Sequence, residues 1–290
     1  MLLNDFVAER TRLFSVAHRI LGSAHDAEDA LQTAWLHVQA APGREIDDVP
    51  AWLTTVVTRV CLDQLRGRRR RDVLARRAEP VPDSALAADE EILVREDVSR
   101  ALMVLLDRLT APQRVAFVLH DLFAVPFDQI AAILDTTPAN AKKHASRARG
   151  RVRPDQAAIA TADDAQHQKV VSAFLDAAAG GDIARMLALM APDCVRVVDH
   201  ALVPPGTPTR VAGAAAVAEE TRYFVDRIRS SARLRVNGRT AHVIAPGGHA
   251  LAVVDIGTEA GVDTCIAIRP VVATDVLEAA VDQACGKCDL

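Results

Sequence analysis

The stretch DQIAAILDTTPANAKKHASRARGRVR, residues 128–153, contains two helical patterns joined by a short turn. Thr137 is a favourable helix N-cap and Pro138 a favourable first helical residue, so we expect the second helix to begin there. The apolar positions of each half recur at helical spacing and form one face. They are Phe127, Ile130, Ala131 and Leu134 in the first helix, and Ala141, Ala145, Ala148 and Val152 in the second. Because the second face consists of small residues, the second helix can lie close across the first.

The remaining surface of the second helix is polar and basic. Its side chains are Asn140, Lys142, Lys143, His144, Ser146 and Arg147. A close-packed pair whose second helix offers such side chains is the construction of a helix-turn-helix, in which that helix enters the major groove of DNA. Arg and Lys reach guanine edges or phosphates, and Asn reads adenine. The pattern therefore predicts a DNA-reading surface, and an ordinary helical hairpin is the alternative.

The distribution of charge favours nucleic-acid contact, although the formal net charge of the 290-residue chain is −4. Residues 59–77 contain eight Arg against two Asp, and residues 139–153 contain six Lys or Arg and no acid. Such concentrated basic patches are what phosphate contact requires, because neutralised phosphates release their counterions locally. Two patches on separate helical segments predict contact with two separated DNA elements. A pair of solvated basic helices is the alternative.

Helical patterns fill the first half of the chain, whereas the second half mixes helices and strands. Residues 5 to 75 read as helices, and the acidic, Ala- and Pro-rich segment that follows reads as a linker, with helices resuming near residue 92. A later helical hairpin is broken at Gly180-Gly181, and short β-like runs joined by Gly or Asn-Gly turns follow Pro192. The expected fold is multidomain. It has all-α domains at 1–75 and 98–153, linkers at 76–97 and 154–164, and an α+β domain at 165–285.

Composition limits the cellular setting and the chemistry. Half of the residues are apolar, which is enough to build cores, yet no apolar run is long enough to cross a membrane. The N-terminus lacks the pattern of a secretory signal, so we expect a cytoplasmic protein without a membrane partner. Five scattered cysteines fit reduced thiols better than a disulfide framework. Cys285 and Cys288 form a CxxC that fits a redox switch, half of a zinc site or a frayed tail, and we expect no metal and no cofactor.

Three segments in order resemble a known family. They read LFSVAHRILGSAHDAEDALQTAWLHV (13–38), VPAWLTTVVTRVCLDQLRGRRRR (49–71) and LTAPQRVAFVLHDLFAVPFDQIAAILDTTPANAKKHASRARGRV (109–152). They resemble regions 2 and 4 of an extracytoplasmic-function RNA polymerase sigma factor of the sigma-70 family. The resemblance implies a region 2 helical bundle, a region 4 helix-turn-helix, and a non-enzymatic role in promoter-specific transcription initiation on core RNA polymerase.

The resemblance also implies roles for particular residues. The segment 26–32 resembles the helix that docks on the clamp helices of the polymerase, with Asp26, Glu28, Asp29 and Gln32 as candidate contacts. The helix dipole is an alternative reason for the first two acids. The helix-turn-helix resembles the reader of the −35 promoter element, and its domain also touches the polymerase flap. Candidate contacts to the −10 element are Trp52, Arg59, Asp63, Arg66, Arg68, Arg69 and Arg70.

The last part of the chain resembles a SnoaL-like domain of the NTF2-like superfamily. The segments VVSAFLDAAAGGDIARMLALMAPDCVRVVD (170–199) and RVAGAAAVAEETRYFV (210–225) are similar to it. Together, the two parts resemble the sigma subgroup with such an extension, sometimes called SigJ-like. This implies a cone of helices against a sheet, with a pocket. Because this domain follows region 4 directly in the chain, we expect a regulatory or ligand-sensing domain that contacts the sigma regions in cis. Where related members carry an Asp-Gly-Gly-Gly run, this chain reads Asp199-His200-Ala201-Leu202-Val203.

Four residues are candidates for the C-terminal pocket, namely Asp199, His200, Asp255 and Arg269. A His beside an Asp can act as a tuned base, and a surface pair is the alternative. We expect no catalysis, because no nucleophile or metal-ligand motif is present. Two other classes stay open: a one-component helix-turn-helix regulator with a ligand-sensing NTF2-like domain, and an NTF2-like enzyme with a DNA-binding tether. The sequence does not identify a ligand.

Overall fold

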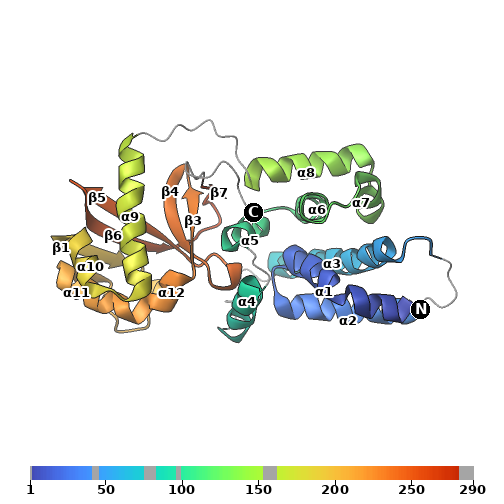
Figure 1. Ribbon diagram of the computed structural model, residues 1–290, viewed down its shortest axis with the longest axis horizontal. Coiled ribbons are helices and arrows are strands. Elements are labelled where there is room, and N and C mark those ends of the chain that lie inside the picture. The colour runs from blue at the N-terminus through green and yellow to red at the C-terminus, as the bar shows by residue number, and fades with distance from the viewer. Residues whose placement is uncertain (1, 41–45, 75–82, 96–98, 153–161, 281–290) are drawn as a thin grey trace. The chain divides into compact units, whose positions relative to one another are not determined.

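The computed structural model describes residues 2–40, 46–74, 83–95, 99–152 and 162–280. The chain divides into two compact units, a helical unit over residues 1–154 and a C-terminal unit over residues 155–289. In the described residues, helices alone build the first unit, and helices and strands build the second (Figure 1). The fold class expected from the sequence, all-α domains followed by an α+β domain, is therefore confirmed.

The first helices of the helical unit form a bundle around buried side chains such as Leu13, Ile20 and Leu53. Ser23 caps α2 as its sequence position suggests, because its hydroxyl accepts a hydrogen bond from the Asp26 amide. The edge of one aromatic ring meets the face of another where Trp35 packs on Phe6, with ring centroids 5.3 Å apart. The helices are α1 (Leu2–Leu21), α2 (Ala24–Gln39) and α3 (Val49–Leu74).

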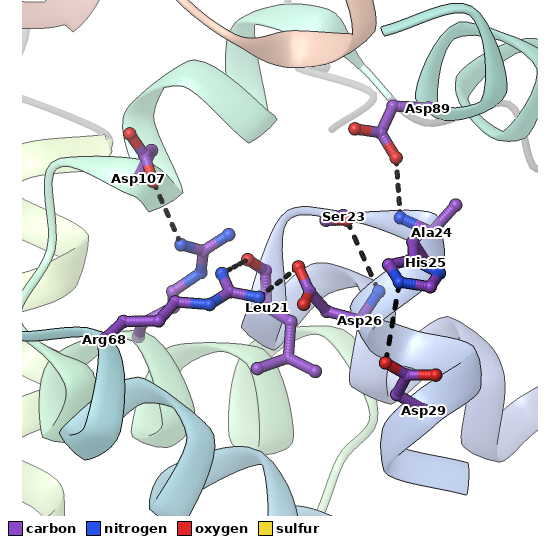
Figure 2. Close-up of polar contacts among 10 residues, drawn as sticks. Leu21, Ser23, Ala24, His25, Asp26, Asp29, Arg68, Asp89 and Asp107 are labelled. Carbon is purple, nitrogen blue, oxygen red and sulfur yellow. Dashed lines mark hydrogen bonds and ion pairs between the residues drawn. The ribbon is translucent and has the colours of Figure 1, made fainter. Parts of the chain in front are cut away.

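The structure differs from the sequence prediction in the segment expected to be a linker. Residues Asp83–Arg95 form helix α4, in which Ile92 and Leu93 are buried. Asp89 is also buried, and its Oδ1 accepts a 2.6 Å hydrogen bond from the backbone N–H of Ala24, at the start of α2 (Figure 2). The prediction was wrong here because the partner of this carboxylate lies 65 residues away, where no local pattern reveals it.

The second helical group contains the predicted helix-turn-helix. The capping box of Thr110 and Gln113 starts α6, and a π-helical segment extends that helix. The small face of α8 is buried as predicted, since Ala141, Ala145 and Ala148 are fully inaccessible. The elements are α5 (Arg100–Asp107), α6 (Ala111–Phe117), η1 (Val118–Leu122), α7 (Phe127–Ile133) and α8 (Pro138–Val152).

A seven-stranded mixed sheet forms the C-terminal unit, in the order β2-β1-β6-β5-β4-β3-β7. The predicted helical hairpin precedes it, and the Asn237-Gly238 turn joins β3 to β4 with both φ angles positive, as a tight hairpin requires. Helices and short turns of this unit are α9 (Ala162–Gly180), α10 (Ile183–Leu189), η2 (His200–Leu202), α11 (Ala214–Thr221), η3 (Arg222–Phe224), α12 (Val225–Arg229) and η4 (Pro246–Gly248). Its strands are β1 (Met190–Val198), β2 (Arg210–Ala212), β3 (Ser231–Val236), β4 (Arg239–Ile244), β5 (Ala252–Glu259), β6 (Val262–Pro270) and β7 (Leu277–Ala279).

Two features of this unit do not follow from the predicted run of short strands joined by turns. β1 pairs with β6 in parallel, so a strand from the start of the unit lies beside one from near its end. Residues 210–212 form strand β2, and helix α11 begins only after Gly213, whose φ of 94° suits glycine. Apolar side chains of α9, α10 and α11 pack with those of the sheet into one core, which includes Phe174, Met186 and Val217.

Candidate nucleic-acid and protein interfaces

The four predicted contacts on α2 fall into two groups. Asp26 forms an ion pair with Arg68 of α3 (Figure 2), so its carboxylate takes part in internal packing. Glu28 lies 2.6 Å from Arg10 Nη2, and the Asp29 carboxylate is 3.6 Å from the imidazole of His25, one turn earlier. These pairs are solvent-exposed and hold the acids weakly.

An exposed apolar side chain extends this acidic face. Leu36 is 61% exposed and lies one helical turn beyond Gln32, which is also exposed. Asp29, Gln32 and Leu36 therefore follow one another along the outward stripe of α2. Sequence reasoning missed Leu36. The available signal was a large apolar residue outside the buried stripe, at seven residues from Asp29.

The predicted DNA contacts on α3 have different surroundings. Trp52 is half-buried, and Arg59 is exposed, with its Nη2 donating a 2.9 Å hydrogen bond to the carbonyl oxygen of Ala132. Asp63 and Arg66 form an exposed ion pair of 3.2 Å one turn apart. Arg68 instead turns inward, where it donates to the carbonyl oxygen of Leu21 at 3.1 Å and pairs with Asp26 (Figure 2). The side chains of the predicted contacts Arg69 and Arg70 lie outside the described part of the chain.

Helix α8 presents its predicted polar face outward. The exposed residues are Asn140, Lys142, Lys143, Ser146 and Arg147. His144 is partly buried, and burial, followed by the positive charge of Arg147, lowers the pKa of its imidazole. This ring is therefore neutral near pH 7 and can donate one hydrogen bond and accept another.

Two further basic side chains of α8 hold the helix in place. Arg149 Nε donates a 2.5 Å hydrogen bond to the carboxylate of Asp121 in η1, and Arg151 Nη1 donates to the carbonyl oxygen of Arg108 at 3.4 Å. The outward basic surface of α8 is consequently narrower than its sequence suggests.

A buried arginine joins the first bundle to the second helical group. Arg114 of α6 is 4% exposed, its Nε donates a 2.9 Å hydrogen bond to the carbonyl oxygen of Arg19, and Nη1 lies 3.4 Å from Asp107. Burial lowers the pKa of this guanidinium, partly offset by Asp107. Gly22 ends α1 with a φ of 77°, and a β-carbon there would lie 2.8 Å from Arg114 Nη2. The close approach therefore requires glycine.

Helix α7 also contacts α3 directly. The Gln129 side-chain amide donates to the carbonyl oxygen of Ala51 at 2.7 Å, and its nitrogen is 3.4 Å from the Thr55 hydroxyl. With the bond from Arg59 to Ala132, these contacts place the first helix of the helix-turn-helix along the N-terminal half of α3. That half also contains Trp52.

The predicted C-terminal pocket residues do not line either of the two cavities described below. The imidazole of His200 is 90% exposed and lies 3.2 Å from Asp199, whose carboxylate caps the short turn η2. Asp255 is exposed on β5. Arg269 makes two hydrogen bonds to Asp275, of 2.8 and 3.0 Å, which lower the pKa of that carboxyl to about 2. Asp199 and Arg269 therefore stabilise local turns, whereas His200 and Asp255 are exposed.

Among the described residues, no group of three or more His, Cys, Asp or Glu side chains is placed to hold a metal ion. Within the same ranges, no helix combines the length and apolar character needed to cross a bilayer. Cys285 and Cys288 lie outside the described residues. Burial raises the pKa of the Cys61 thiol in α3 to about 12, so that group is unreactive.

The helical unit is similar in sequence to known proteins. Residues 6–71 match the family model of sigma-70 region 2, and residues 99–152 match that of sigma-70 region 4. The chain is 32% identical over 197 residues to the probable ECF RNA polymerase sigma factor SigI of Mycobacterium tuberculosis, covering 66% of this chain and 68% of that protein. The chain belongs to the extracytoplasmic-function family of RNA polymerase sigma factors. The family resemblance of residues 13–152 is thus confirmed.

Two further comparisons concern another sigma factor of this family. The chain is 43% identical over 198 residues to the ECF RNA polymerase sigma factor SigJ of Mycobacterium tuberculosis, covering 67% of this chain and 63% of that protein. The crystal structure of SigJ is 32% identical and has a TM-score of 0.44, covering 92% of this chain and 96% of that one. The present chain thus spans 63% of the length of SigJ and 68% of the length of SigI. Arg114, Gln129 and Arg59 join its regions 2 and 4.

Proposed function

We propose that this sigma factor binds core RNA polymerase and directs promoter-specific initiation through both helical regions. One observation supports this most strongly: an exposed acidic face on α2 coexists with a helix-turn-helix in the same unit. A one-component DNA-binding regulator needs the helix-turn-helix alone. An outward stripe of acids with an apolar residue is suited to a basic protein surface.

The polymerase contact is assigned to the exposed part of α2. Glu28, Asp29 and Gln32 remain candidate contacts to the clamp helices, and Leu36 joins them because an exposed apolar side chain beside charges is typical of a docking surface. Asp26 has an internal partner in Arg68, so we assign it to positioning α2. The polymerase flap is the proposed partner of region 4.

The promoter contacts are assigned to α3 and α8. Trp52, with its partly exposed ring, is the candidate for the −10 element, together with the cationic side chains of Arg59 and Arg66. On α8, Asn140 and Arg147 are the candidate base readers of the −35 element. Exposed Lys142, Lys143 and Ser146 are suited to phosphates, and neutral His144 to either role.

The C-terminal unit is proposed to regulate the sigma regions in cis, without catalysis. Its covalent position directly after region 4 supports this role. The absence of catalysis is supported by the setting of the Asp199–His200 pair. That imidazole is exposed, whereas a tuned base requires partial burial or a fixed partner geometry.

The test is co-elution of the full-length chain with sigma-free core RNA polymerase in size-exclusion chromatography. Wild type is expected to co-elute, and Asp29→Arg to lose co-elution, because it reverses a charge at the centre of the α2 stripe. Glu259→Arg is the matched control, since it makes the same charge change at an exposed position of β5. It is expected to co-elute like wild type.

Two results would contradict the proposal. Failure of the wild-type chain to co-elute, combined with its binding to a palindromic DNA site by itself, would favour the one-component regulator. Equal co-elution of wild type and Asp29→Arg would remove α2 from the interface.

A further inference from the structure

The C-terminal unit contains an apolar cavity that no role assigned above explains. It lies between helix α9, the segment α11–α12 and the sheet, and its volume is about 90 Å³. Apolar side chains form most of its wall, including Phe174, Val254, Ile266 and Ile268. An engineered apolar cavity of about 150 Å³ binds benzene, so a space of this size suits a molecule of a few non-hydrogen atoms.

Two of the charged side chains in the wall, Arg196 and Glu220, form an ion pair and neutralise each other. Arg196 is 6% exposed, its Nε donates to Glu220 at 3.1 Å, and both of its Nη atoms donate to the carbonyl oxygen of Pro208 at 3.2 Å. A carboxylate ligand would have to displace Glu220 from this buried pair, which leaves a buried charge without its partner. Arg227, at the rim, is exposed and already donates to the carbonyl oxygen of Leu202, so it attracts an anion only weakly.

The wall also contains a polar atom of an uncharged side chain, His242. His242 Nε2 is buried and has no hydrogen-bond partner among the described residues. Burial, and then the charge of Arg233, lowers the pKa of this imidazole to about 4, while Asp176 opposes the shift. The ring is therefore neutral at pH 7, and Nε2 either donates or accepts according to the tautomer.

His242 also belongs to the wall of a second hollow. A second, larger hollow of about 350 Å³ shares Leu175, Ile228, Ser231 and His242 with the cavity, and its other walls are mostly polar. The unpartnered nitrogen thus lies where an apolar space meets a polar one.

We propose that this cavity binds a small, neutral, mostly apolar molecule whose single hydroxyl or carbonyl group pairs with His242 Nε2. The apolar part of the ligand lies against Phe174, Val254 and Ile266. The uncharged imidazole and the closed Arg196–Glu220 pair select against carboxylates. That binding alters transcription would rest on the regulatory role proposed above, whereas the binding itself does not.

The experiment compares 1-propanol with propionate, which share a carbon skeleton but differ in charge. The full-length chain, labelled at Ile, Leu and Val methyl groups, is titrated at pH 7 and followed by NMR. We expect 1-propanol to shift the methyl signals of Val254, Ile266 and Ile268, and propionate to leave them unchanged. Equal shifts with propionate, or none with 1-propanol, would overturn the proposal. Because no polymerase or promoter is present, either result is independent of the sigma activity.

A pair of variants tests the hydrogen bond. His242→Phe keeps a ring of similar size and is expected to weaken 1-propanol binding about five- to tenfold, as the loss of one hydrogen bond predicts. His200→Phe, at an exposed site, is the control and should bind like wild type. Xenon, which needs only the apolar space, should still shift the same methyl signals in His242→Phe, and this also verifies that the variant is folded. Unchanged 1-propanol affinity in His242→Phe would exclude the proposed pairing.

Discussion

Replacing Gly22 with alanine tests how regions 2 and 4 are joined. Gly22 ends α1 in the left-handed conformation, and its amide donates to the carbonyl oxygen of His18 at 2.7 Å. A β-carbon at this position meets Arg114 Nη2 at 2.8 Å, which is too close for two non-bonded atoms. The end of an arginine usually moves away easily. Arg114, however, is buried and bonded to Arg19 and Asp107, so it has little room to move.

The expected cost has two parts. The left-handed backbone costs an alanine about 1–2 kcal/mol. Displacing Arg114 breaks its bond to the Arg19 carbonyl and leaves that oxygen buried, which costs about 1–3 kcal/mol. Gly22→Ala should therefore lower the unfolding free energy of the helical unit by about 2–5 kcal/mol. Arg114→Ala should cost only the second part, because the desolvation of the guanidinium is relieved at the same time.

Tryptophan fluorescence during urea unfolding measures these effects selectively. Trp35 and Trp52 are the two tryptophans of the chain, and both lie in region 2. In the double variant Gly22→Ala/Arg114→Ala the close contact no longer exists, so the two changes should sum to about 1–3 kcal/mol less than the single effects predict. If the effects are additive within about 0.5 kcal/mol, Arg114 does not pack on Gly22 and the described junction is wrong.

Three further predictions concern separate parts of the chain. Asp263 is fully buried without a hydrogen-bond partner among the described residues, and burial raises the pKa of its carboxyl to about 7. The protonated carboxyl therefore contributes stability that is fully present below the pKa of the unfolded chain. This contribution is lost as the pH rises through 7. The stability advantage of Asp263→Asn, measured by circular dichroism, should therefore grow by about 2–3 kcal/mol between about pH 5 and pH 8, and a constant difference would contradict the assignment. Holoenzyme carrying both Lys142→Ala and Lys143→Ala should bind promoter DNA with a salt slope reduced by about 2, whereas an unchanged slope would exclude phosphate contact. Ala145→Leu should destabilise the helical unit by about 1–3 kcal/mol in urea unfolding, while exposed Ala139→Leu should change it by less than about 0.5 kcal/mol, and equal effects would contradict the buried face of α8.

Local patterns were sufficient to predict α8, but not α4. The small face of α8 recurs at helical spacing next to a favourable cap, so its burial follows from sequence alone. In α4, Asp89 accepts a hydrogen bond from the backbone N–H of Ala24, in another part of the chain. A buried carboxylate is read from sequence as a solvated one, and the segment then resembles a linker.

The candidate interfaces were also only partly predictable from sequence. Sequence identifies which side chains are basic or acidic, but not which of them have internal partners. Arg68 and Arg149 are both bound to acids of other elements, Asp26 and Asp121, at sequence distances where no periodicity applies. In the C-terminal unit, too, sequence does not reveal which distant residues come together. The cavity at His242 forms only when α9, the α11–α12 segment and five strands come together, whereas the conspicuous Asp199–His200 pair lies at the surface.

The hydrogen bonds between α7 and α3 contribute to the free energy that is needed to separate regions 2 and 4. Under the proposed function, the N-terminal half of α3 and the helix-turn-helix face different DNA segments. In the compact unit, Gln129 and Arg59 bond these elements to each other. Two such hydrogen bonds contribute about 0.5–1.5 kcal/mol each, which is within the range of a typical allosteric coupling energy. To separate the regions, polymerase or DNA binding would have to supply this free energy and also the roughly 1–3 kcal/mol of the buried Arg114–Arg19 contact. A C-terminal unit that shifted this balance by 1–3 kcal/mol would change the population of the open form by about 5- to 150-fold.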